Sequence, residues 1–246
     1  MEMFDLTGRV ALVTGGSRGI GSAIALTLAE HGAAVGVNFI SNEEAALMTV
    51  AAIEERGGKA IPVRGDVSDK DAVALVTGEV SEYFGPIDIL VANAGVGEAL
   101  EIEETTEEDF TGLLHNNLTS AFLCSQAVVP GMRARKWGRL IYVSSGAAYN
   151  GGRVGLHYSA AKGGMEGLAR AYARRLMAEG VTANCVAPIR IETDMIVTVS
   201  AEELGPPPPI GRAGHVDEVA GAVLLLATNA YMTGQTVHMN GGIYFN

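Results

Sequence analysis

Short, continuously apolar segments alternate with helix-like segments along the whole chain of 246 residues. The apolar segments lie at residues 9–14, 33–38, 60–63, 87–91, 139–143, 181–186 and 236–239. Strands buried on both faces of a parallel sheet are apolar throughout, whereas half-exposed strands alternate with polar residues. The pattern therefore predicts a parallel sheet, which restricts the chain to architectures with helices on both faces.

Helix-like segments separate these strands and supply the crossovers that parallel strands require. They lie at residues 19–31, 42–56, 69–83, from about 106, at 119–135, around Tyr158 and at 216–227. Right-handed crossovers give a doubly wound sheet. With no linker or internal repeat, we expect an α/β fold: a single-domain Rossmann-type doubly wound parallel sheet of about seven strands over residues 1–246. Residues 206–209 are four consecutive prolines, which exclude a helix and place a substrate lid at about residues 189–212.

Composition excludes several classes of protein. No apolar run is long enough to cross a membrane, and the N-terminus lacks the pattern of a signal peptide, so we expect a cytoplasmic protein. The two cysteines, Cys124 and Cys185, have no metal-type spacing and are interpreted as buried reduced thiols. The five histidines are scattered, so no metal site is proposed. A net charge of −11 argues against nucleic acid or an anionic membrane as partner.

A glycine-rich turn joins the first strand to the first helix. It begins at Thr14 and contains the residues that we expect to bind a dinucleotide: Gly15, Ser17, Arg18, Gly19, Ile20 and Gly21. Glycines let the backbone approach a pyrophosphate, and the helix N-terminus offers free N–H groups with the positive end of the helix dipole. Such a turn alone is a weak signal, but its position between a first strand and a helix favours a nucleotide site.

The ends of the next strands predict which cofactor binds. The second strand ends at Asn38, where an NAD site normally has a carboxylate for the ribose hydroxyls. Arg18 is suited to a 2′-phosphate, and Ser41 adds a neutral donor, so NADP(H) is favoured over NAD(H). At later strand ends, the candidate residues for binding the adenine are Asp66 and Val67, and those for packing beneath the cofactor are Asn93, Ala94 and Gly95. All five are also compatible with ordinary turns.

Tyr158 and Lys162 are four residues apart, and Ser145 precedes Tyr158 by thirteen. Residues i and i+4 share one face of a helix, so the ammonium and the phenol are expected side by side. Lowering the phenol pKa from about 10 to about 7 requires about 4 kcal/mol of differential stabilisation. A desolvated ammonium nearby supplies a stabilisation of this kind, which makes the tyrosine a general acid and base. The competing interpretation is a chance pair on a long helix.

Together these residues resemble the short-chain dehydrogenase/reductase family, over essentially the whole chain and in the family's order. The likeness is greatest to 3-oxoacyl-acyl-carrier-protein reductases and acetoacetyl-CoA reductases. It implies that Ser145 binds the substrate oxygen, Tyr158 transfers the proton, Lys162 holds the nicotinamide ribose, and Asn117 anchors a water relay. It also implies cofactor contacts from Pro188, Ile191 and Thr193, and a homotetramer.

Departures from the family pattern guide the expected function. Ile189 follows Pro188 where a glycine is usual, and Glu179 replaces a basic residue used to meet acyl carrier protein. With the negative net charge, this argues against acyl carrier protein as a partner. We expect an NADPH-dependent oxidoreductase that reversibly reduces a ketone, such as a β-keto thioester or β-keto ester, to a secondary alcohol. The alternatives are an NAD-dependent secondary-alcohol or sugar dehydrogenase and, more remotely, a non-catalytic dinucleotide-binding regulatory protein.

Overall fold

The computed structural model describes residues 4–193 and 207–245. Within them, strands form one parallel seven-stranded sheet in the order β3-β2-β1-β4-β5-β6-β7. The order reverses between β1 and β4, which creates a crevice at the carboxyl ends of these strands. The sheet confirms the predicted Rossmann-type doubly wound fold. Its strands are β1 Val10–Val13, β2 Ala34–Phe39, β3 Lys59–Arg64, β4 Ile89–Ala92, β5 Gly138–Val143, β6 Val181–Pro188 and β7 Thr236–Met239.

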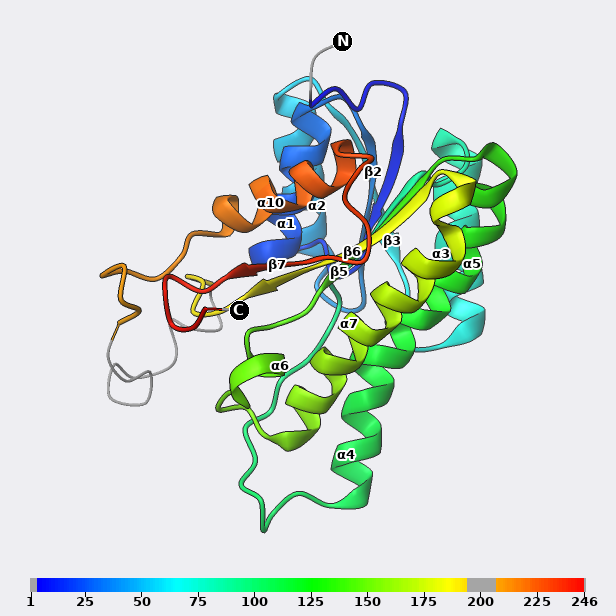
Figure 1. Cartoon of the computed structure of the whole chain (residues 1–246). Coiled ribbons are helices and arrows are strands. Elements are labelled where there is room, and N and C mark those ends of the chain that lie inside the picture. Colours follow the sequence, from blue (N-terminus) through cyan, green and yellow to red (C-terminus); the bar gives the residue numbers. More distant parts are fainter. Residues whose placement is uncertain (1–3, 194–206, 246) are drawn as a thin grey trace.

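Helices cover both faces of the sheet (Figure 1). One layer packs a core of alanine, valine, leucine and isoleucine against the sheet and consists of α1 Gly19–Glu30, α2 Glu43–Glu55 and α10 Val216–Thr228. The opposite layer consists of α3 Lys70–Phe84, α5 Ser120–Arg135 and α7 Leu156–Leu176. The strands β1, β4, β5 and β6 are buried along their whole length. Burial on both faces explains why β1 and β4 contain no polar residue.

Shorter elements surround the carboxyl ends of the strands. Helix α4, Glu107–Leu114, runs through a π-helical segment, His115–Thr119, into α5, while α6, Ala147–Asn150, follows β5. A 3₁₀ turn, Met177–Glu179, ends α7. The sequence predicted α4 and α5 but neither the π-helical segment nor α6. Within the described residues, none of the helices combines the length and apolar character that crossing a bilayer requires.

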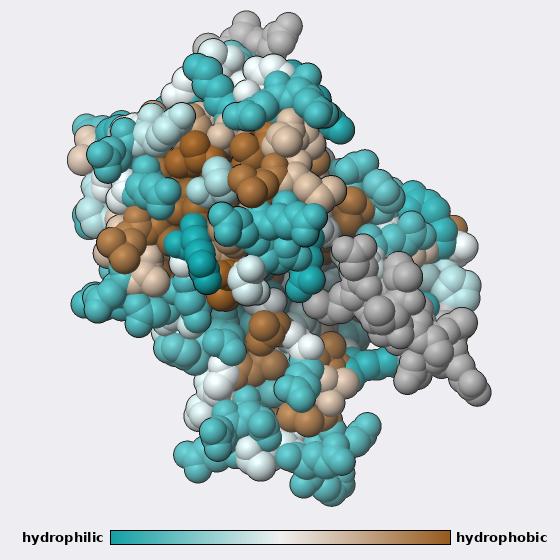
Figure 2. All heavy atoms as spheres, turned by 180° about the vertical axis from the view of Figure 1, so that it is seen from behind, coloured by the Kyte–Doolittle hydropathy of each residue, from teal (hydrophilic) through white to brown (hydrophobic). Residues whose placement is uncertain are grey.

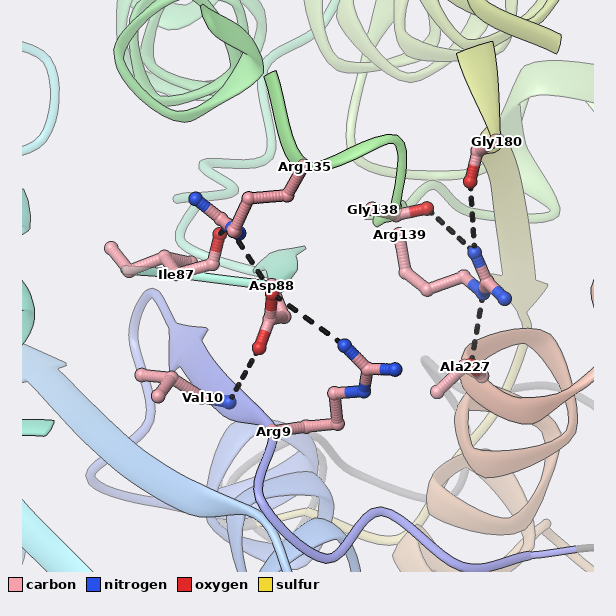
Figure 3. Close-up of polar contacts among 9 residues, drawn as sticks. All are labelled: Arg9, Val10, Ile87, Asp88, Arg135, Gly138, Arg139, Gly180 and Ala227. Atoms are coloured by element: carbon pink, nitrogen blue, oxygen red, sulfur yellow. Dashed lines mark hydrogen bonds and ion pairs between the residues drawn. The ribbon is translucent and has the colours of Figure 1, made fainter. Parts of the chain in front are cut away.

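Two buried charges tie the opposite, amino-terminal ends of the strands together (Figure 3). Asp88 accepts a hydrogen bond from the Val10 amide at 3.3 Å and pairs with Arg135 at 3.2 Å and Arg9 at 4.0 Å. Arg139 is 3% exposed. It donates hydrogen bonds to main-chain carbonyl groups of Gly138, Gly180 and, at the last turn of α10, Ala227. Burial lowers the pKa of Arg139 to about 10. These contacts fix the sheet end farthest from the candidate site.

Candidate active site

The candidate catalytic residues converge at the carboxyl ends of β4, β5 and β6, where α6 and α7 approach the sheet (Figure 1). Ser145 lies two residues after β5. The next amide, Gly146 N–H, donates to the Pro188 carbonyl at the end of β6 at 3.0 Å. The Ala147 amide donates to the Ser145 hydroxyl oxygen at 3.2 Å. One bond therefore ties the turn that carries Ser145 to β6, and the other closes the turn on itself.

Tyr158 lies in the first turn of α7. The helix starts after Gly155, whose φ of 131° is a conformation that favours glycine. The Ser145 side chain interacts with the phenol of Tyr158, which brings the two hydroxyl groups into one neighbourhood. Burial raises the pKa of Tyr158 above its ordinary value of 10, and the interaction with Ser145 opposes this rise. The phenol is therefore protonated at neutral pH, which is the form that donates a proton.

Lys162 is 4% exposed, one helical turn after Tyr158. Its Nζ donates to the Val143 carbonyl at 2.8 Å and lies 5.6 Å from the centre of the Tyr158 ring. Burial lowers the pKa of Lys162 to about 8. The expectation that this ammonium lowers the pKa of Tyr158 is not met in the structure. Burial dominates at both groups, because it disfavours the charged form of each.

Asn117 lies in the π-helical segment and is fully buried. Its side-chain amide exchanges two hydrogen bonds with the main chain of Val96: Val96 N–H donates to Oδ1 at 2.8 Å, and Nδ2 donates to the Val96 carbonyl at 2.9 Å. A Cβ on Gly95 would lie 3.0 Å from Asn117 Oδ1 and 3.5 Å from Lys162 Nζ. Asn117, rather than the exposed Asn116, thus holds the loop after β4 beside Lys162.

The hydroxyl of Ser144 points to α7 below the site, which leaves Ser145 as the serine that faces Tyr158. Ser144 is 2% exposed and lies within hydrogen-bonding distance of the Lys162 carbonyl, at 3.0 Å, and of Glu166, at 3.2 Å. It binds β5 to α7 below the site. The thirteen-residue spacing to Tyr158 selects Ser145 over Ser144, and the structure places the two hydroxyls accordingly.

The glycine-rich turn is held by β4. Asn93 Nδ2 donates to the carbonyls of Thr14 and Gly15, both at 3.0 Å, and the Thr14 hydroxyl accepts from the amides of Asn93 and Ala94, both at 3.0 Å. A Cβ at Gly21 would lie 2.1 Å from the Gly15 carbonyl oxygen, so a side chain there is incompatible with the turn. Thr14 supports the turn through these bonds. The sequence analysis placed Thr14 in the motif but did not predict that it contacts the cofactor.

The N-terminus of α1 has the features of an anion site. Its first residue follows Arg18, which makes no side-chain capping bond, and its first turn holds no acidic residue. In contrast, Asn42, Asp69 and Thr106 cap α2, α3 and α4. The first amides of α1 are thus available to a phosphate. Beside them lie the remaining turn residues, Ser17, Gly19 and Ile20, and Gly15 and Gly19 have positive φ.

The predicted adenosine contacts divide into exposed and internal residues. Asn38 is 1% exposed: its Oδ1 accepts from Gly15 N–H at 3.3 Å, and its Nδ2 donates to the Gly65 carbonyl at 3.0 Å. It therefore shapes the turn and has no donor left for a ribose. Arg18, Ser41 and Asp66 are exposed, and Val67 is buried.

Arg64, an exposed cation at the end of β3, was not among the residues predicted for the cofactor site. Its Nε donates to the Ile40 carbonyl at 3.2 Å, which brings it beside the end of β2. Its position directly before Gly65 and Asp66 is the signal that would have found it.

On the far side of the crevice, Thr193 approaches α1. A Cβ on Gly19 would lie 3.6 Å from Thr193 Cγ2. Ile191 is 5% exposed and forms an isolated bridge with Gly214, so it serves as packing. Pro188 is buried at the end of β6. The predicted lid at residues 189–212 includes residues 194–206, which lie outside the described residues, so it stays a prediction.

Comparison with known proteins shows the family to which the chain belongs. A family model described as "short chain dehydrogenase" matches residues 9–204. The chain belongs to this family. This short-chain dehydrogenase is 42% identical over 244 residues to a 3-oxoacyl-[acyl-carrier-protein] reductase of Synechocystis, covering 98% of this chain and 99% of that one. It is 39% identical over 246 residues to one of Vibrio cholerae, with the same two coverages.

Solved structures of the family superpose closely on this chain. A short-chain type dehydrogenase/reductase from Mycobacterium marinum has a TM-score of 0.93 at 32% identity, covering 100% of this chain and 99% of its own. A dehydrogenase/reductase from Sinorhizobium meliloti has a TM-score of 0.90 at 34% identity, covering 98% and 96%. The chain is therefore an oxidoreductase, as the sequence predicted. Among the described residues, no group of three or more His, Cys, Asp or Glu side chains is arranged to hold a metal ion.

Proposed function

We propose that this enzyme reduces neutral ketones to secondary alcohols with NADPH, and that the same residues catalyse the reverse oxidation. The observation that carries the proposal is the grouping of Ser145, Tyr158 and Lys162: the Ser145 side chain interacts with the Tyr158 phenol, and Lys162 Nζ lies 5.6 Å from the centre of the Tyr158 ring. A carbonyl oxygen beside the hydroxyl groups of Ser145 and Tyr158 accepts a hydrogen bond from each as negative charge develops on it. The open N-terminus of α1 and the glycine-rich turn fit a dinucleotide, and NADPH when bound supplies the hydride.

The protein's own residues handle the proton. Ser145 holds and polarises the carbonyl, and Tyr158 transfers its phenolic proton to the oxygen as the carbonyl carbon gains hydride. A raised pKa keeps that proton on Tyr158 until the oxygen becomes a strong base. Lys162, with its pKa lowered to about 8, stabilises the phenolate that remains and would hold the nicotinamide ribose of a bound cofactor. Asn117 holds the loop that includes Gly95.

The adenosine end favours NADP(H). Arg18 and Arg64 supply cations near the end of β2, Ser41 supplies a neutral donor, and no carboxylate occupies the end of that strand. A guanidinium binds a 2′-phosphate with two parallel hydrogen bonds, whereas an NAD site uses a carboxylate on the ribose hydroxyls. The proposed location is the cytoplasm, which accords with Cys124 and Cys185 because both thiols are free and buried.

The electrostatics argue against acyl carrier protein, an acidic partner, although curated relatives at 38–42% identity carry its name. Arg133 is paired with Glu179 at 2.7 Å, and Arg135 is paired with Asp88. The loop and helix start beside the site carry seven carboxylates between residues 98 and 109. Residues 98–109 lie at the lower tip of the molecule, which is largely hydrophilic (Figure 2). We therefore propose small β-keto esters or related ketones as substrates.

A homotetramer is the proposed assembly. A groove between α5 and α7 is lined by small and apolar side chains, and Phe122 beside it is 42% exposed. Gly163 and Gly167 on α7 have open space around them, so another helix can approach closely. A second copy would cover this apolar surface. Light scattering tests the assembly, and a monomer of 25.5 kDa would contradict it.

The function is tested by loss of NADPH absorbance with purified protein and a panel of β-keto esters, acetoacetyl-CoA, simple ketones and sugars. We expect turnover of the β-keto esters and a preference for NADPH over NADH. No turnover of any ketone would contradict the reductase proposal. A preference for NADH with alcohols or sugars would favour the alternative dehydrogenase. Tight NADPH binding without turnover of any compound would favour a regulatory protein.

A further inference from the structure

Three aromatic rings pack together next to the catalytic serine, and the reaction described above uses none of them. They come from separate parts of the chain: Tyr149 from α6, His238 from β7 and Tyr244 from the C-terminal segment. Tyr149 stacks on Tyr244 with ring centres 5.5 Å apart and planes 5° apart. His238 and Tyr149 pack edge to face, with ring centres 4.2 Å apart and planes at 81°. Offset-stacked and edge-to-face geometries are the favourable ones for aromatic pairs.

A hydrogen bond fixes the phenol of Tyr244 within this cluster. Its oxygen lies 2.8 Å from His238 Nδ1. Nε2 of His238 is buried and has no hydrogen-bond partner among the described residues, so Tyr244 is the partner that the imidazole has there. The main chain around Tyr244 is held as well, because Asn240 Nδ2 donates to the Tyr244 carbonyl at 2.8 Å. Tyr244 is thus oriented at both its backbone and its side chain.

The fixed phenol touches the turn that carries Ser145. A Cβ on Gly146 would lie 3.3 Å from the Tyr244 hydroxyl and 2.9 Å from Cβ of Ile189. Gly146 is therefore enclosed between Tyr244 and Ile189, and its amide is bound to Pro188. Directly after it, α6 begins and presents Tyr149 to the same phenol ring. A displacement of Tyr244 would remove a packing contact from both the Ser145 turn and α6.

We propose that Tyr244 is a positioning residue of the ketone site, which acts through the Ser145 turn and α6 and is itself oriented by His238. On this proposal the end of the chain contributes to catalysis without touching the reacting atoms. The inference rests on the proposed ketone reduction, since it assigns the cluster to the binding of that substrate. A misplacement of about 1 Å in a reacting group costs on the order of a hundredfold in rate. Loss of one hydrogen bond costs less, about threefold to tenfold.

The test compares Tyr244→Phe, which keeps the ring and removes the hydroxyl, with Tyr244→Leu, which removes the stack. Tyr231→Phe is the control, because Tyr231 is 99% exposed. For the β-keto ester with the best turnover, we expect kcat to fall about threefold to tenfold in Tyr244→Phe and further in Tyr244→Leu. The NADPH dissociation constant of Tyr244→Phe should match that of the control, and its melting temperature should fall only by the small amount that one lost hydrogen bond costs. A purely structural role would lower the melting temperature and leave kcat per folded molecule unchanged.

Two further variants test whether His238 acts through Tyr244. His238→Leu should reproduce the loss in Tyr244→Phe, and the double variant should be no worse than either single one, because both remove the same bond. His238→Gln, which keeps a polar atom, should recover most of the activity. Additive losses, or full activity in Tyr244→Phe, would overturn the proposal.

Hydrogen exchange separates this proposal from the proposed function. Amides of residues 145–150 should exchange faster in Tyr244→Phe than in the wild type, with the rest of the chain unchanged, whether or not a ketone is turned over. If the wild type reduces no ketone but Tyr244→Phe still shows the faster exchange, the proposed ketone reduction is wrong and the positioning role is supported. If the wild type is active and Tyr244→Phe shows unchanged exchange and unchanged kcat, only the positioning role is wrong.

Discussion

Gly21→Ala is expected to disrupt the glycine-rich turn, although alanine is the better helix former. A Cβ at this position would lie 2.1 Å from the Gly15 carbonyl oxygen and 2.7 Å from Asn93 Nδ2. Relieving the overlap requires a shift of about 1 Å, and overpacking of this kind costs about 1–3 kcal/mol. The Asn93 bond to Gly15 O, 3.0 Å long, would be lost as well, at about 1 kcal/mol. The higher helix propensity of alanine offsets about 1 kcal/mol of this loss of stability. The expected net loss of stability is therefore about 1–3 kcal/mol.

Gly78→Ala is the matched control for this substitution. Gly78 lies inside α3, and a Cβ on it would meet no atom within 4 Å, so alanine should stabilise the protein by about 0.5–1 kcal/mol. Urea unfolding measures both variants, and fluorescence titration with NADPH measures binding, which should weaken at least tenfold in Gly21→Ala. The reasoning is refuted if Gly21→Ala is as stable as Gly78→Ala and binds NADPH like the wild type.

Three other perturbations follow from the charges. The pKa of Lys162 falls from its ordinary 10.5 to about 8 on folding, so the unfolded state binds more protons between these pH values. The stability of the wild type relative to Lys162→Met should therefore rise from pH 8 to 10.5, as measured by urea unfolding; a flat difference would contradict the burial effect. Arg139→Met leaves the carbonyls of Ala227 and Gly138 without their donor and should cost about 2 kcal/mol; an unchanged unfolding midpoint would contradict this. Arg18→Glu should weaken NADPH binding at least tenfold in a fluorescence titration and spare NADH, whereas equal losses for both would remove Arg18 from the 2′-phosphate site.

The fold was predictable because the sheet is buried on both faces. Strands such as Ile89–Ala92 contain no polar residue, and this absence is visible in the sequence. The π-helical segment was not predictable, because it depends on the contact that Asn117 makes with Val96, twenty-one residues away. The short helix α6 was missed for a similar reason. Its four residues are positioned by tertiary packing against Tyr244 and His238 rather than by helix propensity.

The candidate site was predicted by spacing more reliably than by electrostatics. Motif spacing distinguished Ser145 from Ser144, and the structure brings Ser145 to Tyr158. The predicted direction of the Tyr158 pKa shift was wrong, because burial of the phenol outweighs the attraction of an ammonium that is itself buried. Asn38 was expected at the ribose because it ends a strand. Its side chain instead points inward, where it bonds Gly15 and Gly65, and this orientation depends on the neighbouring strand.

The most direct test of the account is the rate of ketone reduction by Tyr158→Phe at saturating NADPH. Phenylalanine keeps the ring and removes the proton that the carbonyl oxygen is held to receive. We expect kcat to fall on the order of a hundredfold or more, with the NADPH dissociation constant and the melting temperature close to those of the wild type. Wild-type turnover in this variant would show that the proton comes from another group and would contradict the mechanism.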